Sequence, residues 1–183
     1  MLQTAKFSIE EFERILASGV LGDRQLELLQ GDLVEMPSEG SAHSGLANLI
    51  AEYLRGLLGD RARIREGYHI TLPDLASEPI PDITIVKPSP DFYRSRNPYP
   101  SDSFWLIEVA YSSLKKDLGI KAALYAQAGI PEYWVVDVNA EILVVHRGAR
   151  GGTFRNVHER IEGTLSPLAF PDLEVSIPII LGQ

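Results

Sequence analysis

The segment FWLIEVAYSS, residues 104–113, places one carboxylate inside an otherwise apolar run. The run from Phe104 to Ala110 is typical of a strand that is covered on both of its faces. Glu108 interrupts this run. An ionised carboxylate is costly to bury alone, so we expect Glu108 to have a cationic partner or to bind a metal ion.

The composition is that of one soluble globular domain, which we expect to span residues 1–183. Of these residues, 45% are hydrophobic and 23% are charged, which is a usual balance for such a domain. The absence of cysteine excludes a cysteine-ligated zinc site and a thiol nucleophile. The sequence has no signal-peptide pattern and no apolar run of membrane-spanning length, so we predict a cytoplasmic protein without membrane contact.

The formal net charge of −8 restricts how this domain could bind a nucleic acid. It disfavours nonspecific binding over the whole surface but still allows a local basic groove. Arg61, Arg63 and Arg65 alternate along the chain and would share one strand face. Arg94 and Arg96 lie in a loop with aromatic residues. Both groups are candidates to contact phosphates, although a solvated surface is the ordinary interpretation.

Hydrophobic periodicity and turn residues predict a mixture of helices and strands. Ser8 and Glu11 form a capping-box pattern at the first helix, and Gln30 with Gly31 suits a hairpin turn. The elements are, in chain order, a helix at 8–18, a hairpin at 26–36, a helix at 43–58, strands at 63–72, 81–87 and around Glu108, a helix at 113–128, paired strands in EYWVVDV and EILVVHR, and one or two short strands in the tail. This order predicts an α/β domain with a mixed central sheet flanked by helices.

Two acids on successive predicted strands are the candidate centre of a metal site. Asp82 opens the strand at 81–87, and Glu108 lies inside the next strand. Neighbouring strands are about 4.8 Å apart, so carboxylates at matching heights can share a divalent cation. Mg²⁺ prefers oxygen ligands and can activate a water for hydrolysis. The pair therefore predicts a magnesium site.

A lysine is expected beside these acids, to orient the attacking water or to stabilise developing charge. The simplest position for it is two residues after Glu108 on the same strand face, but the sequence has Ala110 there. The next candidates belong to the following helix and are Lys115, Lys116 and Lys121.

Lys121 lies about one turn inside that helix, where its side chain can reach back over the sheet. Asp117, Lys121 and Tyr125 recur every four residues, which places them on one helix face. On spacing alone, Asp117 and Lys121 form an ordinary exposed helix pair, so a catalytic role for Lys121 needs further support.

The order of these acids and lysine along the chain resembles that of the PD-(D/E)XK nuclease superfamily. Within the superfamily, the resemblance is closer to a bacterial family of nucleases of unknown function that is abundant in cyanobacteria. The matching pieces, which span residues 26–138, are LELLQGDLVEM, His43, PDITIV, IEVAYSS and KAALYAQAGIPEYWVVD. The resemblance implies a restriction-endonuclease-like fold with an αβββαβ core. It also implies hydrolysis of DNA phosphodiester bonds with Mg²⁺, for which Mn²⁺ can substitute, and assembly as a homodimer.

The resemblance further implies roles for individual residues. Asp82 and Glu108 correspond to the metal-binding acids. Lys121 corresponds to a catalytic lysine that has moved from the strand to the helix. Glu27 matches an acid that the superfamily often takes from an early element.

His43 and Tyr125 are the candidate substrate-binding residues. His43 is part of the matching pattern and is expected near the acids, at the metal or at a substrate phosphate. A cap or a surface position is the ordinary alternative for it. Tyr125 shares the helix face of Lys121 and is expected to contact substrate from there.

Other interpretations stay open on the sequence. The fold could persist without catalysis as a nucleic-acid-binding or interaction module, which predicts that Lys121 lies far from Asp82 and Glu108. The two acids could instead form a glycosidase pair, which predicts carboxylates across an open sugar-sized cleft. Asp82 could also cap a turn, Glu108 could pair with an arginine, and Glu27 could be a solvated strand residue.

Overall fold

The computed structural model describes residues 4–36 and 40–183, and its N-terminal part follows the sequence prediction. Helix α1 (Ile9–Ala17) begins at the predicted capping box, in which Ser8 and Glu11 exchange hydrogen bonds between side chain and backbone of 3.2 and 2.8 Å. Strands β1 (Leu26–Leu29) and β2 (Asp32–Glu35) form the predicted antiparallel hairpin. Both turn residues, Gln30 and Gly31, have the positive φ that a tight hairpin requires.

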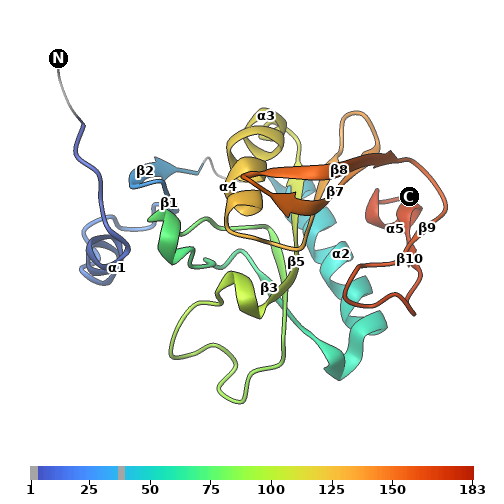
Figure 1. Ribbon diagram of the computed structural model, residues 1–183, viewed down its shortest axis with the longest axis horizontal. Coiled ribbons are helices and arrows are strands. Elements are labelled where there is room, and N and C mark those ends of the chain that lie inside the picture. Colours follow the sequence, from blue (N-terminus) through green and yellow to red (C-terminus); the bar gives the residue numbers. More distant parts are fainter. Residues whose placement is uncertain (1–3, 37–39) are drawn as a thin grey trace.

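A six-stranded mixed sheet forms the centre of the molecule (Figure 1). Its strand order is β3-β4-β5-β6-β7-β8, and every neighbouring pair is antiparallel except β5 and β6. The strands are β3 (Arg63–Glu66), β4 (Ile83–Val86), β5 (Ser103–Ala110), β6 (Glu132–Asp137), β7 (Ile142–Arg150) and β8 (Thr153–Arg160). The sheet confirms the predicted α/β class.

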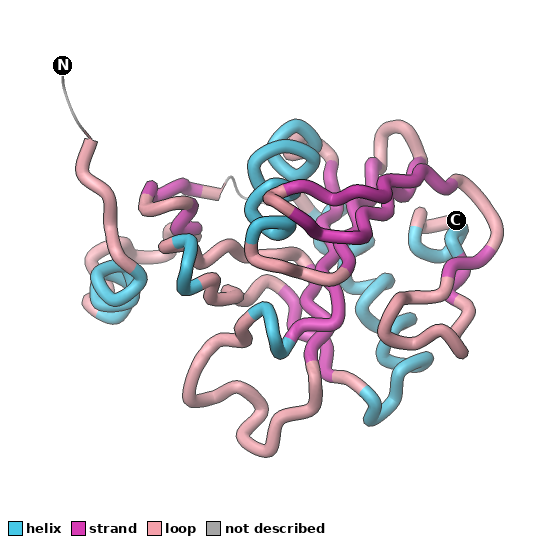
Figure 2. Tube along the Cα trace, in the orientation of Figure 1, coloured by secondary structure: helices cyan, strands magenta, loops and turns pink. Residues whose placement is uncertain are grey.

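Helices cover both faces of this sheet (Figures 1 and 2). Helix α2 (Ser41–Leu58) packs on one face together with the C-terminal elements β9 (Thr164–Leu165), β10 (Val175–Ser176) and α5 (Ile177–Ile180). The parallel connection from β5 to β6 runs over the other face, as such a connection requires a crossover. It consists of α3 (Leu114–Lys116), a π-helical turn (Asp117–Lys121) and α4 (Ala122–Gln127). Short 3₁₀ turns lie at Gly59–Arg61, Pro73–Leu75 and Pro100–Asp102.

Alternation along β5 divides its side chains between two cores. One set packs in the core under α2 and comprises Trp105, Ile107 and Val109. Leu106 and Ala110 pack in the core under α4. Glu108 has the same parity as these two residues and so points to the α4 side. Ala110, the strand position at which a lysine was expected, therefore lies beneath the helical segment that carries Lys121.

The structure corrects three predictions about the elements. The strand expected at 63–72 ends at Glu66, because Gly67 adopts a positive φ of 65° and donates its N–H to the Asp82 carbonyl at 3.0 Å. The helix expected at 113–128 contains a π-helical turn, which a search for the α-helical period cannot detect. The tail holds two short strands, β9 and β10, as expected, but the eight-residue strand β8 that precedes them was not predicted. It lies at the sheet edge with mostly exposed side chains, so it has no apolar alternation.

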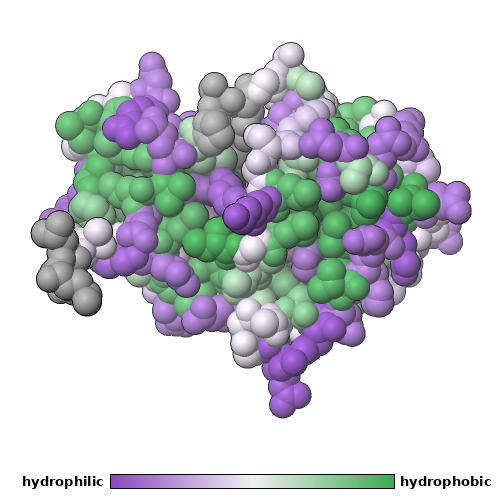
Figure 3. Space-filling view, turned by 90° about the horizontal axis from the view of Figure 1, so that it is seen from above, coloured by the Kyte–Doolittle hydropathy of each residue, from purple (hydrophilic) through white to green (hydrophobic). Residues whose placement is uncertain are grey.

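The surface mixes polar and apolar side chains. Hydrophilic and hydrophobic residues are interspersed on the face shown in Figure 3. The exposed apolar side chains include Leu118 and Ile120 of the π-helical turn and Val157 of β8. In the part of the chain that the structure describes, no helix combines the length and the apolar character needed to cross a bilayer.

Candidate active site

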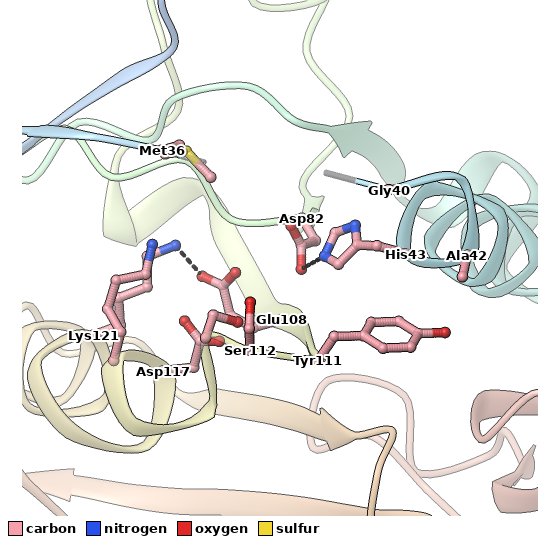
Figure 4. A pocket seen from close by; sticks show the side chains of 12 residues that line it. Met36, Gly40, Ala42, His43, Asp82, Glu108, Tyr111, Ser112, Asp117 and Lys121 are labelled. Carbon is pink, nitrogen blue, oxygen red and sulfur yellow. Dashed lines mark hydrogen bonds and ion pairs between the residues drawn. The ribbon is translucent and has the colours of Figure 1, made fainter. Parts of the chain in front are cut away.

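Asp82 and Glu108 lie together where β4 and β5 meet. The ladder between these strands pairs Ile83 with Ile107, and the same register continued by one residue sets Asp82 opposite Glu108. Both carboxylates line one pocket of about 280 Å³ (Figure 4). The structure thus brings the two predicted acids to one place, while their role stays a prediction.

Two contacts hold the carboxylate of Asp82 at the edge of β5. Its Oδ2 atom accepts a hydrogen bond of 2.6 Å from the backbone N–H of Val109. The Nε2 atom of His43, in the first turn of α2, lies 3.1 Å from the same oxygen. His43 also lines the pocket, so the structure places it beside the acids.

Glu108 is buried, and its contacts fall on one of its two oxygens. Its Oε1 atom accepts hydrogen bonds from the ammonium group of Lys121 at 2.8 Å and from the hydroxyl of Tyr125 at 3.0 Å. Burial raises the pKa of Glu108 well above its usual value; the charge of Lys121 lowers it in part, and Asp82 raises it. All the hydrogen bonds that the described residues donate to Glu108 reach Oε1, which leaves Oε2 for a proton or a cation.

Lys121 is a buried cation between two buried acids. Its Nζ atom lies 2.8 Å from Glu108 Oε1 and 2.8 Å from Glu27 Oε1, and it donates to the Ile80 carbonyl at 3.0 Å. Burial alone would lower the pKa of Lys121, but Glu108 and Glu27 outweigh burial and raise it. The ammonium group therefore stays charged in the folded protein.

Glu27 and Tyr125 lie behind the pocket rather than in its lining. Glu27, on β1, accepts a hydrogen bond from the Ile80 N–H at 2.9 Å and one from Lys116 at 3.2 Å. Burial would raise the pKa of Glu27, but Lys121 and Lys116 outweigh it and lower that pKa. Tyr125 is fully buried and contacts Glu108. Glu27 contacts Lys121 and Tyr125 contacts Glu108, while a catalytic role for Glu27 and substrate contact by Tyr125 stay predictions.

The donor set at the pocket fits a hard divalent cation. Asp82 and Glu108 offer carboxylate oxygens on neighbouring strand positions, which is the ligand type that Mg²⁺ prefers. Among the described residues, no three histidine, aspartate or glutamate side chains are arranged to hold a metal ion by themselves. Two carboxylates would leave coordination positions to water or phosphate, as is common for Mg²⁺.

The structure also shows an acid that the sequence prediction did not assign to the site. Asp117 is buried and lines the same pocket as Asp82 and Glu108. Spacing placed it on the helix face of Lys121, but only as an ordinary exposed ion pair. Its regular interval to Lys121 was the one available signal, and that signal has no special meaning without knowledge of burial.

The arginines considered for phosphate contact are engaged elsewhere. Three of them pair with acids, as Arg61 with Asp172 at 2.7 Å, Arg63 with Asp60 at 3.3 Å and Arg96 with Asp102 at 2.7 Å. The guanidinium group of Arg65 lies over the ring of Tyr68, and Arg94 donates to a backbone carbonyl. None of the five is among the described residues that line the pocket of the acids.

Comparison with known proteins places this geometry in a family. The chain matches the sequence model of the Uma2 family, described as "Putative restriction endonuclease", over residues 9–178. Among solved structures, it is similar to a protein from Anabaena variabilis ATCC 29413 that is described as a "putative nuclease". The TM-score is 0.75 at 14% sequence identity, over 96% of this chain and 98% of the other.

At that identity the likeness establishes the fold, which is restriction-endonuclease-like as the motifs indicated. A comparison with curated proteins gave no match. The match to the family model covers most of the chain, and the chain therefore belongs to the Uma2 family of restriction-endonuclease-like proteins.

Proposed function

We propose that this chain is a Mg²⁺-dependent nuclease that hydrolyses phosphodiester bonds in DNA. The observation that carries the proposal is the convergence of two carboxylates, Asp82 and Glu108, with the buried ammonium group of Lys121 at one pocket. The description of the family as restriction endonucleases supports the reaction class. The oxygen-only donor set supports Mg²⁺ as the ion, with Mn²⁺ as a substitute.

In this proposal, the side chains around the pocket have separate tasks. A bound divalent cation supplies a Lewis acid that polarises a phosphoryl oxygen and lowers the pKa of a water. Asp82, fixed by the Val109 N–H, and Glu108, fixed by Tyr125, would hold that cation. Lys121 would stabilise the negative charge that develops at the phosphate, since its own charge is kept by two carboxylates.

The contact between Lys121 and Glu108 favours this proposal over a non-catalytic module. That alternative requires Lys121 to lie far from the acids, whereas the two side chains are 2.8 Å apart. A glycosidase pair requires carboxylates that face each other across an open cleft. Asp82 and Glu108 instead lie on neighbouring strand positions.

Metal binding is tested without a substrate by titrating Mn²⁺ into the protein in a calorimeter. The wild type is expected to bind one ion, and Asp82→Asn and Glu108→Gln are expected to lose this binding while they stay folded by circular dichroism. Asp74→Asn is a matched control, because Asp74 is an exposed acid that lines a different pocket. Equal binding by all four proteins would overturn the two-acid site.

Cleavage is tested with supercoiled plasmid and with short duplex DNA in Mg²⁺ or EDTA. The wild type is expected to nick or cut in Mg²⁺ alone, and Glu108→Gln is expected to be slower by at least 100-fold. Cleavage that persists in EDTA, or at an unchanged rate in Glu108→Gln, would contradict the assigned chemistry.

We also propose that two copies of the chain pair along β8, the edge strand of the central sheet. In an antiparallel pairing centred on Val157, Arg155 of each copy would lie opposite Glu159 of the other, so the charges are complementary. Val157 is exposed in the single chain. Sedimentation should show a dimer for the wild type, a monomer for Arg155→Glu, and a restored dimer when Glu159→Arg is added. A monomeric wild type would exclude this assembly.

A further inference from the structure

The π-helical turn Asp117–Lys121 is inverted in polarity relative to an ordinary surface helix. Its charged ends, Asp117 and Lys121, are each 1% exposed, whereas Leu118 and Ile120 between them are 39% and 45% exposed. A surface helix normally turns its apolar face inward. Isolated π-helical turns are rare and occur frequently at functional sites. The burial of Asp117 and Lys121 therefore needs an explanation from the groups that surround these two side chains.

The burial of Lys121 is explained by its ion pairs with Glu27 and Glu108. Asp117 has no comparable partner. Its Oδ1 atom is buried, and no described residue forms a hydrogen bond with it. A buried carboxylate oxygen without a partner is destabilising. Burial accordingly raises the pKa of Asp117, although Lys121 and Ser113 favour its ionised form.

The carboxylate of Asp117, whose Oδ1 atom has no hydrogen-bond partner among the described residues, lines the pocket that holds Asp82 and Glu108 (Figure 4). The pocket, at about 280 Å³, has room for an ion and several waters, since one water takes about 30 Å³ in the liquid. The described residues do not arrange three acids as direct ligands of one ion. A contact through water fits both facts, because Mg²⁺ usually keeps several of its waters.

We propose that Asp117 is a positioning residue of this site, whose carboxylate accepts a hydrogen bond from a water bound to the divalent cation. The inference rests on the proposed metal site at Asp82 and Glu108 and adds a third acid to it. It explains why the chain buries an aspartate on a turn whose neighbouring leucine and isoleucine remain exposed.

The test compares metal affinity with the stability of the metal-free protein. Removing an outer partner of a metal site typically reduces affinity by about 10- to 100-fold. Mn²⁺ titration of Asp117→Ala is therefore expected to show this loss, and Asp117→Asn, which keeps an acceptor oxygen, is expected to lose less. In EDTA, both variants are expected to melt at the same temperature as the wild type or higher. A merely structural aspartate would give the opposite pattern, with lower melting and unchanged affinity.

The outcomes separate this inference from the proposed function. If the wild type binds Mn²⁺ and the Asp117→Ala variant binds it with equal affinity, the proposed role of Asp117 is overturned and the two-acid site stays intact. A wild type that does not bind Mn²⁺ overturns the metal site, and the role of Asp117 with it. Asp74→Asn serves as the control, with unchanged affinity and melting, because its side chain is exposed and remote from this pocket.

Discussion

Two buried glutamates on neighbouring parallel strands have opposite surroundings. Glu132, the first residue of β6, accepts hydrogen bonds from Arg147 at 2.6 and 2.8 Å and from the indole of Trp134 at 2.8 Å, all on Oε1. The Leu168 N–H donates to its other oxygen at 2.7 Å. Glu108 on β5 has donors on Oε1 only, and it lines a pocket with a second acid.

The difference shows that burial of an acid does not by itself identify a functional site. Glu132 has partners on both oxygens and ties β6 to β7 and to the chain near Ser166 through Arg147. Glu108 has one oxygen with partners and one without any among the described residues. Incomplete hydrogen bonding next to a pocket is therefore the feature that distinguishes the candidate site from a structural ion pair.

The largest effect on stability is expected when the lysine of the site is removed. Lys121→Met leaves Glu27 and Glu108 buried without their shared cation, and loss of one partner of a buried ion pair costs about 3–5 kcal/mol. Urea unfolding of the metal-free variant should show this decrease. The matched control is Lys116→Met, which removes the second, partly exposed lysine of Glu27 and should cost at most about 1 kcal/mol. Similar costs for both would mean that Lys121 is an ordinary ion-pair residue.

The two glutamates should respond with different sign to the same substitution. Glu132→Gln places an amide among donors from Arg147, Trp134 and Leu168, so about 1–3 kcal/mol of unfolding free energy should be lost. Glu108→Gln removes a charge that burial disfavours and should leave the metal-free stability unchanged or higher. Urea unfolding in EDTA measures both. If Glu108→Gln lowered the free energy of unfolding as much as Glu132→Gln does, the distinction between the surroundings of the two glutamates would not hold.

The smallest effect is a pH dependence within the candidate site. The folded-state pKa of Glu108 is raised, so its contribution to stability is present below the unfolded value of about 4.5 and is lost as the pH rises through the folded pKa. The pKa of Glu27 is lowered, so its contribution is present above about 4.5 and is lost as the pH falls.

Urea unfolding in EDTA should therefore show the stability of Glu108→Gln rising relative to the wild type as the pH increases from 4.5 to 8. The stability deficit of Glu27→Gln should stay nearly constant over that range and shrink as the pH falls below about 4.5. A constant difference between Glu108→Gln and the wild type from pH 4.5 to pH 8 would contradict the raised pKa.

Most of the architecture could be predicted because each element has a local signal. The capping box at Ser8, the positive-φ turn at Gln30 and Gly31 and the apolar run around Glu108 are visible in the sequence. The extent of β8 was not visible, since an exposed edge strand needs no apolar alternation. The end of β3 depends on the conformation of Gly67, which composition alone does not give.

The site could be predicted only in part, because burial is a property of the fold. Glu108 was conspicuous in its apolar run, Asp82 became a candidate because it opens the preceding predicted strand, and the family motifs favoured Lys121 among the lysines of the next helix. The arginine partner considered for Glu108 belongs instead to Glu132, whose Arg147 lies on another strand. The spacing of Asp117 and Lys121 is that of an exposed ion pair on an α-helix. A search for the 3.6-residue helical period cannot detect the π-helical turn in which Asp117 is buried.

The contacts of Lys121 have a consequence for motion. The hairpin β1–β2 forms a separate two-stranded sheet, which is attached to the rest of the molecule partly through Glu27. Because the same ammonium group binds Glu27 on the hairpin, the carbonyl of Ile80 and Glu108 on β5, these three segments cannot separate independently. A fluctuation that frees the hairpin must break the ion pair between Glu27 and the ammonium group that also binds Glu108, so opening of the N-terminal hairpin is coupled to the electrostatics of the pocket.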